Sequence, residues 1–380
     1  MSWEYKTLDE LGSVSRGRSK HRPRNDETLF GGKYPFVQTS DVKKANLYLT
    51  EYESTYNEKG LEQSKLWKAG TLCITIAANI ADTAILGIDA CFPDSVMGFI
   101  PYDGIANVKF VKYAFDMLQR DCKQISQGTA QDNLSWKKLS TIKFPAPDIE
   151  VQNKIVNYLS AYDDLIENNK KQIKLLEETA ERLYREWFVE LHFPGCEDVK
   201  IVDGVPKGWL DGTVGDIALF KRGKTISKAQ IHKGIVPVVA GGLKPAYYHN
   251  VANTVAPVIT ISGSGANAGF ARLYNVDVFA SDCSFVDSQT TPYLFWVYCF
   301  IKDSKAKLDS LQKGAAQPHV YAKDINALKI YIPTDDILDR FCKVVAPYFG
   351  KIKNLQRQND LLLQARDRLL PRLMSGEVEV

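Results

Sequence analysis

The sequence lacks the signatures that mark a catalytic or metal-binding protein. Its seven cysteines form no Cys-x-x-Cys pair, and its five histidines show no metal-ligand spacing. RGKT at 222–225 resembles the end of a phosphate-binding loop, but Ala218 occupies the position of the required upstream glycine. GSGANAG at 263–269 precedes no amphipathic helix, which a dinucleotide site needs, and no Asn-Pro-Pro or Asp-Pro-Pro tetrad of an amino-methyltransferase occurs. We therefore expect a chain that is not itself an enzyme and holds no metal or cofactor of its own.

Long apolar runs and a strong net charge are also missing. The longest apolar run, YLFWVYCFI at 293–301, is too short to cross a bilayer, and the charged start MSWEYKTLDE is unlike a signal peptide. The cysteines are scattered and their number is odd. Both observations argue against a disulfide framework and predict a reducing, cytoplasmic location. The net charge of +3 is uneven, because 148–194 is net negative whereas 1–147 and 195–333 are net positive. The globular parts are therefore basic enough to permit nucleic-acid binding.

The chain contains an internal repeat. GTAQDNLSWKKLSTIKFPAP at 128–147 returns as GAAQPHVYAKDINALKIYIP at 314–333, an offset of 186 that continues without a gap for about sixty residues. Further upstream, Trp3 matches Trp209 at an offset of 206. The repeat predicts a tandem duplication in which each copy is a globular part followed by a helical part. The predicted boundaries are 1–147, 148–194, 195–333 and 334–380.

Both helical parts show a heptad pattern, in which apolar residues alternate at spacings of four and three. The first stripe comprises Ile155, Leu159, Tyr162, Ile166, Asn169, Ile173, Leu176, Ala180, Leu183 and Trp187. The second comprises Phe341, Val345, Tyr348, Ile352, Leu355, Asn359, Leu362, Arg366, Leu369 and Leu373. We expect Asp148 and Thr334 to occupy the caps, and Pro347 with Gly350 to kink or delay the second helix.

The asparagines in the two stripes suggest how the helices are paired. If the helices lie antiparallel with matched ends, Asn169 faces Asn359, and Ala180 faces Tyr348. A buried asparagine that finds a partner fixes the register of a coiled coil at some cost in stability. The alternative is that each asparagine faces water at an imperfect seam.

The globular parts are predicted to be β-rich. GTLCITIA at 70–77 and APVITIS at 256–262 have the pattern of buried strands, and LSTIKFPAP and INALKIYIP are predicted to end each globular part as strands. The sequence thus predicts an α+β fold, with two tandem β-rich domains and two long helices.

Each globular part carries a basic segment, and clustered arginine and lysine side chains are typical of contacts with DNA phosphates. The residues concerned are Arg16, Arg18, Lys20, Arg22 and Arg24 in the first copy, and Lys221, Arg222, Lys224 and Lys228 in the second. The alternative is a pair of solvated loops. Polar residues in nearby segments are candidates for contacts with base edges, although a polar loop residue is more often merely solvated. These candidates are Gln38, Thr39, Asp41 and Asn79 in the first copy, and Asn267, Gln317 and His319 in the second.

Two further segments give the arrangement a family likeness. LYREWFVELHFPGCEDVKIVDGVPKGW at 183–209 joins the first helix to the second globular part, and ARDRLLPRLMSGEVEV at 365–380 ends the chain. Together with the repeated GTAQ and GAAQ segments, they make the chain resemble the specificity (S) subunit of type I restriction–modification systems. The likeness covers essentially the whole chain.

This resemblance implies a fold and a division of labour. Each globular part would be a target recognition domain that recognises one half of a split, asymmetric DNA site, and the domains would be related by a pseudo-twofold axis. The helices would form an antiparallel coiled coil that spaces the domains and docks two methyltransferase (M) subunits, and restriction (R) subunits would join the complex. S-adenosylmethionine, ATP and Mg would bind to those partners. Two alternatives stay open, a stand-alone DNA methyltransferase or nuclease and a coiled-coil scaffold without a role on DNA.

Overall fold

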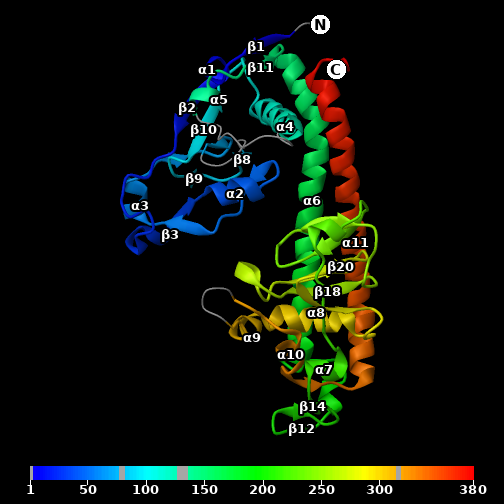
Figure 1. Cartoon of the computed structure of the whole chain (residues 1–380). Coiled ribbons are helices and arrows are strands. Elements are labelled where there is room, and N and C mark those ends of the chain that lie inside the picture. Colours follow the sequence, from blue (N-terminus) through cyan, green and yellow to red (C-terminus); the bar gives the residue numbers. More distant parts are fainter. Residues whose placement is uncertain (1–2, 77–81, 126–135, 314–317) are drawn as a thin grey trace. The chain divides into compact units, whose positions relative to one another are not determined.

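The computed structural model describes residues 3–76, 82–125, 136–313 and 318–380. The chain forms two compact units, Met1–Asn168 with Gln358–Val380, and Asn169–Arg357. Each unit contains one β-rich globular part and a portion of each of the two long helices (Figure 1). The division into four parts at residues 147, 194 and 333 stays a prediction.

The first unit is built on short strands. In chain order they are β1 (Glu4–Lys6), β2 (Gly12–Arg16), β3 (Phe30–Phe36), β4 (Tyr48–Leu49), β5 (Ser54–Tyr56), β6 (Leu66–Trp67), β7 (Leu72–Thr75), β8 (Thr83–Leu86), β9 (Ala90–Cys91), β10 (Val96–Pro101) and β11 (Phe144–Ala146). Its short helices are α1 (Leu8–Leu11), η1 (Glu27–Leu29), α2 (Thr39–Lys44), α3 (Glu58–Glu62), α4 (Val108–Ile125) and α5 (Trp136–Leu139). The sheets have the orders β2-β10-β7-β8-β4, β5-β3-β9-β6 and β1-β11.

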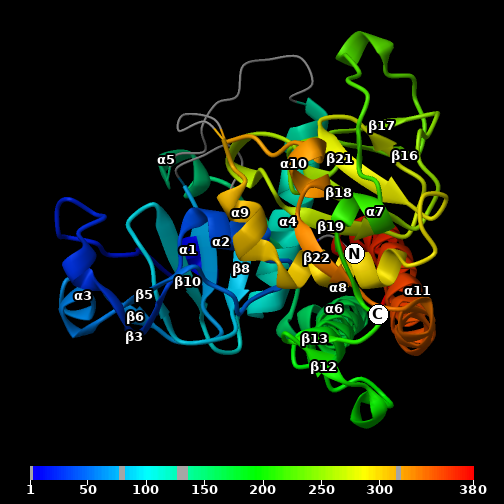
Figure 2. The same cartoon turned by 90° about the horizontal axis from the view of Figure 1, so that it is seen from below.

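The second unit has a similar set of elements. Its strands are β12 (Ile201–Val202), β13 (Val205–Pro206), β14 (Leu210–Thr213), β15 (Lys221–Arg222), β16 (Val236–Val239), β17 (Tyr247–His249), β18 (Val258–Ser262), β19 (Ala271–Tyr274), β20 (Phe279–Ala280), β21 (Cys283–Asp287) and β22 (Lys329–Ile332). Its short helices are α7 (Val214–Ile217), α8 (Leu294–Asp303), α9 (Lys305–Ser310) and α10 (Ala322–Asn326), with 3-10 turns η3 (Cys196–Asp198), η4 (Lys228–Gln230) and η5 (Gly265–Asn267). Helix α8 packs on β18 and β19 (Figure 2).

The two units share one strand order. The antiparallel order β2-β10-β7-β8 of the first unit corresponds to β15-β21-β18-β19 of the second. The order β5-β3-β9, in which β3 and β9 are parallel, corresponds to β17-β16-β20, in which β16 and β20 are parallel. The pair β1-β11 corresponds to β14-β22. The repeat in the sequence is therefore matched by a repeat in topology, and the predicted strands at 70–77 and 256–262 are confirmed as the buried strands β7 and β18.

The two long helices are α6 (Ile149–Phe188) and α11 (Asp335–Met374), and each begins directly after its predicted cap, Asp148 or Thr334. The expected delay at Pro347 was wrong, because α11 starts at Asp335 and runs through this proline without interruption. The backbone amides of residues 337 and 338 donate to the carbonyl of Thr334, which starts the first turn. Val345 and Phe349 on either side of Pro347 are buried in the core of the second unit, and this packing outweighs the loss of one backbone donor.

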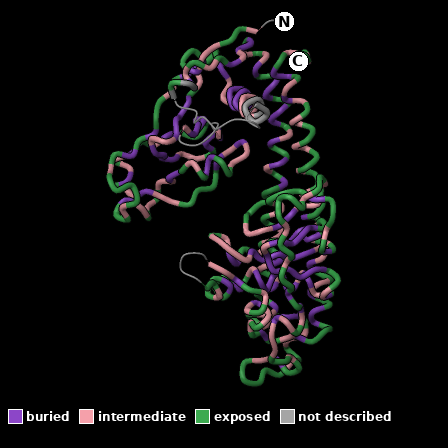
Figure 3. Tube along the Cα trace, in the orientation of Figure 1, coloured by how far each residue is buried: buried purple, intermediate pink, exposed green. Residues whose placement is uncertain are grey.

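Within each unit, α6 and α11 share a core. In the first unit, Ile155 and Leu159 of α6 lie in the same cluster as Leu370 and Leu373 of α11. In the second unit, aromatic residues near the end of α6 contact Phe341, near the beginning of α11: the ring centroids of Tyr184 and Trp187 lie 6.3 and 5.7 Å from it. Buried and exposed positions alternate along both helices (Figure 3).

The buried stripes drift away from a strict heptad. Tyr162 and Leu183 are only half-buried, whereas their neighbours Asp163 and Tyr184 are buried. An α-helix has 3.6 residues per turn, so a pattern of 3.5 shifts across the surface over several turns unless the helices supercoil tightly. Asn169 is 2% exposed and therefore does not face water, while Asn359 is half-buried. The pairing of Asn169 with Asn359 stays a prediction.

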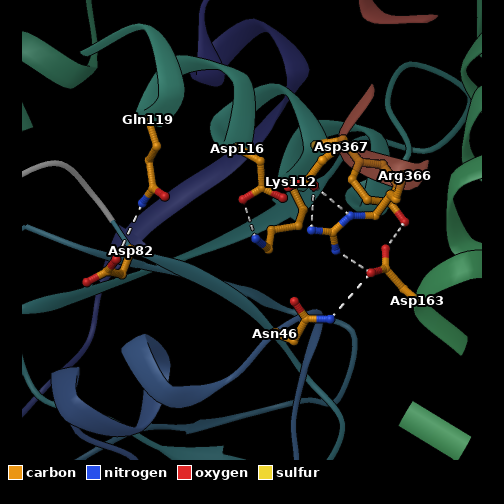
Figure 4. Close-up of polar contacts among 9 residues, drawn as sticks. Asn46, Asp82, Lys112, Asp116, Gln119, Asp163, Arg366 and Asp367 are labelled. Carbon is orange, nitrogen blue, oxygen red and sulfur yellow. Dashed lines mark hydrogen bonds and ion pairs between the residues drawn. The ribbon is translucent and has the colours of Figure 1, made fainter. Parts of the chain in front are cut away.

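The first unit buries a charged network against its portion of the long helices. The Arg366 guanidinium lies between the carboxylates of Asp163 and Asp367, with Nη1–Oδ1 and Nη2–Oδ1 distances of 2.5 and 2.9 Å (Figure 4). The Tyr113 hydroxyl and the Asn46 amide also donate to Asp163, which is completely buried. Burial lowers the pKa of Arg366. The carboxylates of Asp163 and Asp367 raise it by more, so that the pKa of Arg366 lies above its usual range. Position 163 corresponds to Phe349 in the second copy and position 366 to Ala180, so this network belongs to one unit alone.

Candidate nucleic-acid interface

The first basic segment follows β2, and its first residues stay hydrogen-bonded to the neighbouring part of the chain. The Gly17 amide donates to the carbonyl of Val96 at 2.8 Å, and the Arg18 amide donates to that of Phe92 at 3.0 Å. A Cβ atom on Gly17 would lie 2.3 Å from the Pro93 carbonyl oxygen, so only glycine fits here. These two hydrogen bonds hold the backbone against the sheet, while the side chains of all five predicted basic residues are exposed.

The five basic side chains of this segment fall into two groups. Arg24 donates twice to Asp94, at 2.7 and 2.9 Å, and Arg22 donates to the carbonyls of Ser19 and His21. In the part of the chain that the structure describes, Arg16, Arg18 and Lys20 form no side-chain ion pair, and they are the cations of this segment best placed to meet a phosphate.

Asp26 fixes the far end of this segment. Its carboxylate accepts hydrogen bonds from the hydroxyl and the amide of Thr28, and it contacts the His21 ring at 2.7 Å. These hydrogen bonds, those of Thr28 above all, lower the pKa of Asp26 to about 2. The carboxylate therefore stays ionised at neutral pH and holds the loop in shape.

The second unit has the same backbone arrangement at the end of β15. The Gly223 amide donates to the carbonyl of Cys283 at 2.8 Å, and the Lys224 amide donates to that of Ala280 at 2.9 Å. A Cβ atom on Gly223 would lie 2.3 Å from the Ser281 carbonyl oxygen. Lys221, Arg222, Lys224 and Lys228 are exposed, and none has a side-chain ion pair among the described residues. Both predicted basic segments are thus exposed at equivalent strand ends.

The base-contact candidates of the first copy lie at the start of α2. Gln38 is exposed and Thr39 is half-buried. The structure argues against Asp41, which is 5% exposed and accepts a hydrogen bond from the Gln38 amide at 2.8 Å, so its carboxylate caps the helix. Burial raises the pKa of Asp41. Asn79 lies outside the described residues.

In the second copy, Asn267 is half-buried and its side-chain amide donates to the Gly241 carbonyl at 3.4 Å. His319 is half-buried, and its ring stacks on that of Tyr321 with centroids 6.0 Å apart. Gln317 lies outside the described residues.

Two of the predicted residues meet at one cavity in the second unit. Arg222, predicted to contact phosphate, and His319, predicted to contact a base, line a hollow of about 120 Å³. Four further polar residues of this lining were not predicted from the sequence: Ser264, Asp282, Ser284 and Tyr321. In the sequence these residues lie in or beside strands β18 and β21 or, for Tyr321, directly before α10, which is also true of many structural residues.

A comparison with known families identifies the chain. The family model for the type I restriction modification DNA specificity domain matches residues 1–178 and 206–362. The chain belongs to this specificity family. The two matched ranges agree with the repeat, because each contains one basic segment, all or most of one globular part, and most of one heptad stripe.

Named members of the specificity family match along the whole chain. The MjaIX type I restriction enzyme specificity subunit of Methanocaldococcus jannaschii is 26% identical, over 100% of this chain and 94% of that protein. The HindI specificity subunit of Haemophilus influenzae is 22% identical, over 97% of this chain and 98% of that protein. The crystal structure of a type I restriction–modification S subunit from M. genitalium has a TM-score of 0.53 at 18% identity, covering 98% of this chain and 96% of that one, and so shares its fold.

Two other features, a metal-binding cluster and a membrane-spanning helix, are absent from the described part of this specificity-family protein. Residues 3–76, 82–125, 136–313 and 318–380 contain no cluster of three histidine, cysteine or acidic side chains able to hold a metal ion. Within the same ranges, no helix combines the length and apolar character needed to cross a membrane. Cys283 is a buried free thiol whose pKa burial raises to about 12, which makes it a poor nucleophile.

Proposed function

We propose that this chain is the DNA-recognising, non-catalytic subunit of a type I restriction–modification complex, and that each globular part recognises one half of a split site. Methyl transfer and ATP-dependent cleavage belong to partner subunits, which bring S-adenosylmethionine, ATP and Mg. The two half-sites differ in sequence, because the two globular parts share a strand order but few side chains.

The observation that carries this proposal is the pair of equivalent basic strand ends. Gly17 and Gly223 make the same close approach to the neighbouring strand, and an exposed arginine, Arg16 or Arg222, precedes each of them. Two equivalent cationic strand ends suit a ligand that presents phosphates to both globular parts, as a DNA duplex does.

The phosphate role predicts a change in salt dependence. Replacing Arg16, Arg18 and Lys20 with alanine in the assembled complex should weaken binding to all DNA sequences alike, because phosphate contacts carry no sequence information. The slope of log K against log[salt] should fall by about 0.9 for each phosphate that is no longer bound, or about 2.7 for three. Arg24→Ala is the matched control, with a smaller expected change because Arg24 is already paired with Asp94. An unchanged slope with altered sequence preference would show that these residues contact bases instead.

Repeated exposed positions on the long helices support the docking of two methyltransferase subunits. Some buried positions differ between the copies, such as Asp163 against Phe349 and Asn169 against Leu355. Three exposed positions are identical in the two copies: Asn168 with Asn354, Leu175 with Leu361, and Arg182 with Arg368. Leu175 and Leu361 are 61% and 55% exposed, although leucine prefers burial. One partner species bound twice would explain why these three exposed positions are identical on helices whose sequences differ at most other positions.

The docking proposal predicts a change in stoichiometry. Leu175→Glu or Leu361→Glu should each weaken the binding of one methyltransferase subunit by about 2 kcal/mol or more, roughly thirty-fold, since each buries a charge in place of an apolar anchor. Native mass spectrometry should then show one methyltransferase subunit per complex in each single variant, instead of two, and none in the double variant. Leu165→Lys is the control, because Leu165 is also exposed but the second copy has Lys351 there. Retention of two subunits by the double variant would contradict this assignment.

A further inference from the structure

The cavity beside Arg222 contains a carboxylate that the proposed phosphate contacts do not explain. Asp282 follows β20 and precedes β21, and it lines the hollow of about 120 Å³ together with Arg222, Ser284 and His319. A negative charge next to a phosphate-binding arginine repels the DNA backbone, so it opposes binding unless it has a donor to accept from.

One of the two carboxylate oxygens of Asp282 accepts a hydrogen bond. The Ser264 hydroxyl donates to Oδ2, which orients the carboxylate. Among the described residues, Oδ1 accepts no hydrogen bond, and Asp282 itself is only half-buried. The Asp282 carboxylate is therefore oriented through Oδ2, and Oδ1 is able to accept a hydrogen bond.

The first unit has the same backbone here but a different side chain. The Gly263 amide donates to the carbonyl of Asp282 at 3.2 Å, and the Ile76 amide donates to that of Ser95 at 3.0 Å. The adjacent strand pairs, Cys283 with Ser262 and Val96 with Thr75, have the same register. Ser95 is thus the counterpart of Asp282.

The arginine at this strand end is shared, whereas the residue across from it is not. Arg222 pairs with Ser284 in the second unit, and Arg16 pairs with Met97 in the first. A shared cation suits the phosphate that every nucleotide carries. A divergent pair of acceptors, Asp282 and Ser95, suits bases that differ between two half-sites.

We propose that Asp282 is a specificity-determining residue that accepts a hydrogen bond from the exocyclic amine of a base, the N4 amine of cytosine or the N6 amine of adenine, in the major groove of the second half-site. Arg222 holds the adjacent phosphate, and Ser264 orients the carboxylate. Guanine and thymine present an acceptor, O6 or O4, where cytosine and adenine carry this amine, so the charge of Asp282 repels them. The inference rests on the proposed function and names the base class for one position.

The test uses the full complex with its methyltransferase subunits, and methylated sites are sequenced genome-wide for Asp282→Asn and the wild type. Asparagine keeps the shape of aspartate but adds a donor, so guanine and thymine should become acceptable at one position of the second half-site. Discrimination there should fall roughly ten- to a hundred-fold, with the first half-site and the gap unchanged. The wild-type motif itself shows whether the base at this position is cytosine or adenine. Asp211→Asn, an exposed position in β14, is the control for the loss of one charge and should change nothing.

Three results would overturn the assignment. These are a wild-type motif in Asp282→Asn, a uniform loss of affinity without a change at any position, and a change confined to the first half-site. Asp282→Ser, which installs the residue of the first copy, repeats the test if the asparagine variant does not assemble, and thermal unfolding checks both variants. If the wild-type complex itself recognises no sequence, the proposed function fails; if it recognises a split site that the Asp282 variants leave intact, only this inference fails.

Discussion

One heptad inserted into each long helix, near Asn169 and Asn359, should lengthen the unread gap, the spacer of unspecified bases between the two half-sites, by about three base pairs. Seven residues keep the buried stripe in phase and extend a helix by about 10 Å, and DNA rises about 3.4 Å per base pair. The bases recognised should not change, because the insertion touches neither globular part. Affinity should fall, since the two globular parts also rotate around the duplex.

The heptad prediction follows from the proposal that the helices set the spacing. The stripe from Ile155 to Trp187 corresponds to roughly 48 Å of helix, or about 14 base pairs, which leaves an unread gap of about six to ten once the half-sites are subtracted. Insertion into α6 alone is the control, because it breaks the pairing of the stripes and should abolish assembly. An unchanged gap in the double insertion, or altered half-site bases, would show that the coiled coil does not determine the spacing.

Arg366→Ala should destabilise the first unit by about 3–5 kcal/mol, because it leaves the buried charge of Asp163 without its cationic partner. Tyr113 and Asn46 still donate to that carboxylate, but neither neutralises it. Denaturant unfolding of the full chain, monitored with a spectroscopic probe placed in the first unit, measures the change in the free energy of unfolding.

The second copy supplies the matched control for this network. Asp163→Phe combined with Arg366→Ala installs the residues that the second copy has at these positions, Phe349 and Ala180. Replacing a buried ion pair with apolar residues is often neutral or stabilising, so the double variant should recover most of the loss. A loss below about 1 kcal/mol in Arg366→Ala would show that the network is solvated and does not contribute to stability.

The sequence predicted those features that depend on local pattern. Helices α6 and α11 were predictable because a heptad stripe follows a capping residue, and β7 and β18 because they are apolar runs bounded by turn residues. The basic segments were predictable because charge density is visible without a structure. The equivalent close approaches of Gly17 and Gly223 to a neighbouring strand were not, since they depend on backbone contacts between segments about 60 to 80 residues apart.

The residues that sequence reasoning missed depend on long-range contacts. Asp163 lies next to Tyr162 of the predicted stripe but finds its partner 203 positions away, in Arg366, and no local pattern marks such a pair. The capping role of Asp41 was not predictable, because a polar residue after a strand has the same local pattern whether it faces DNA or caps the next helix. Asp282 was missed because only the fold brings it beside Arg222 and Ser264.

The central claim is that one chain recognises two different half-sites separated by unread bases. Methylation mapping in cells that carry this chain with its methyltransferase partner, compared with cells that lack only this chain, tests it most directly. The account predicts methylation at one bipartite motif, with two unlike half-sites and a fixed gap of about six to ten base pairs, and its loss when the chain is removed. A contiguous or palindromic motif, or methylation that persists without the chain, would contradict it.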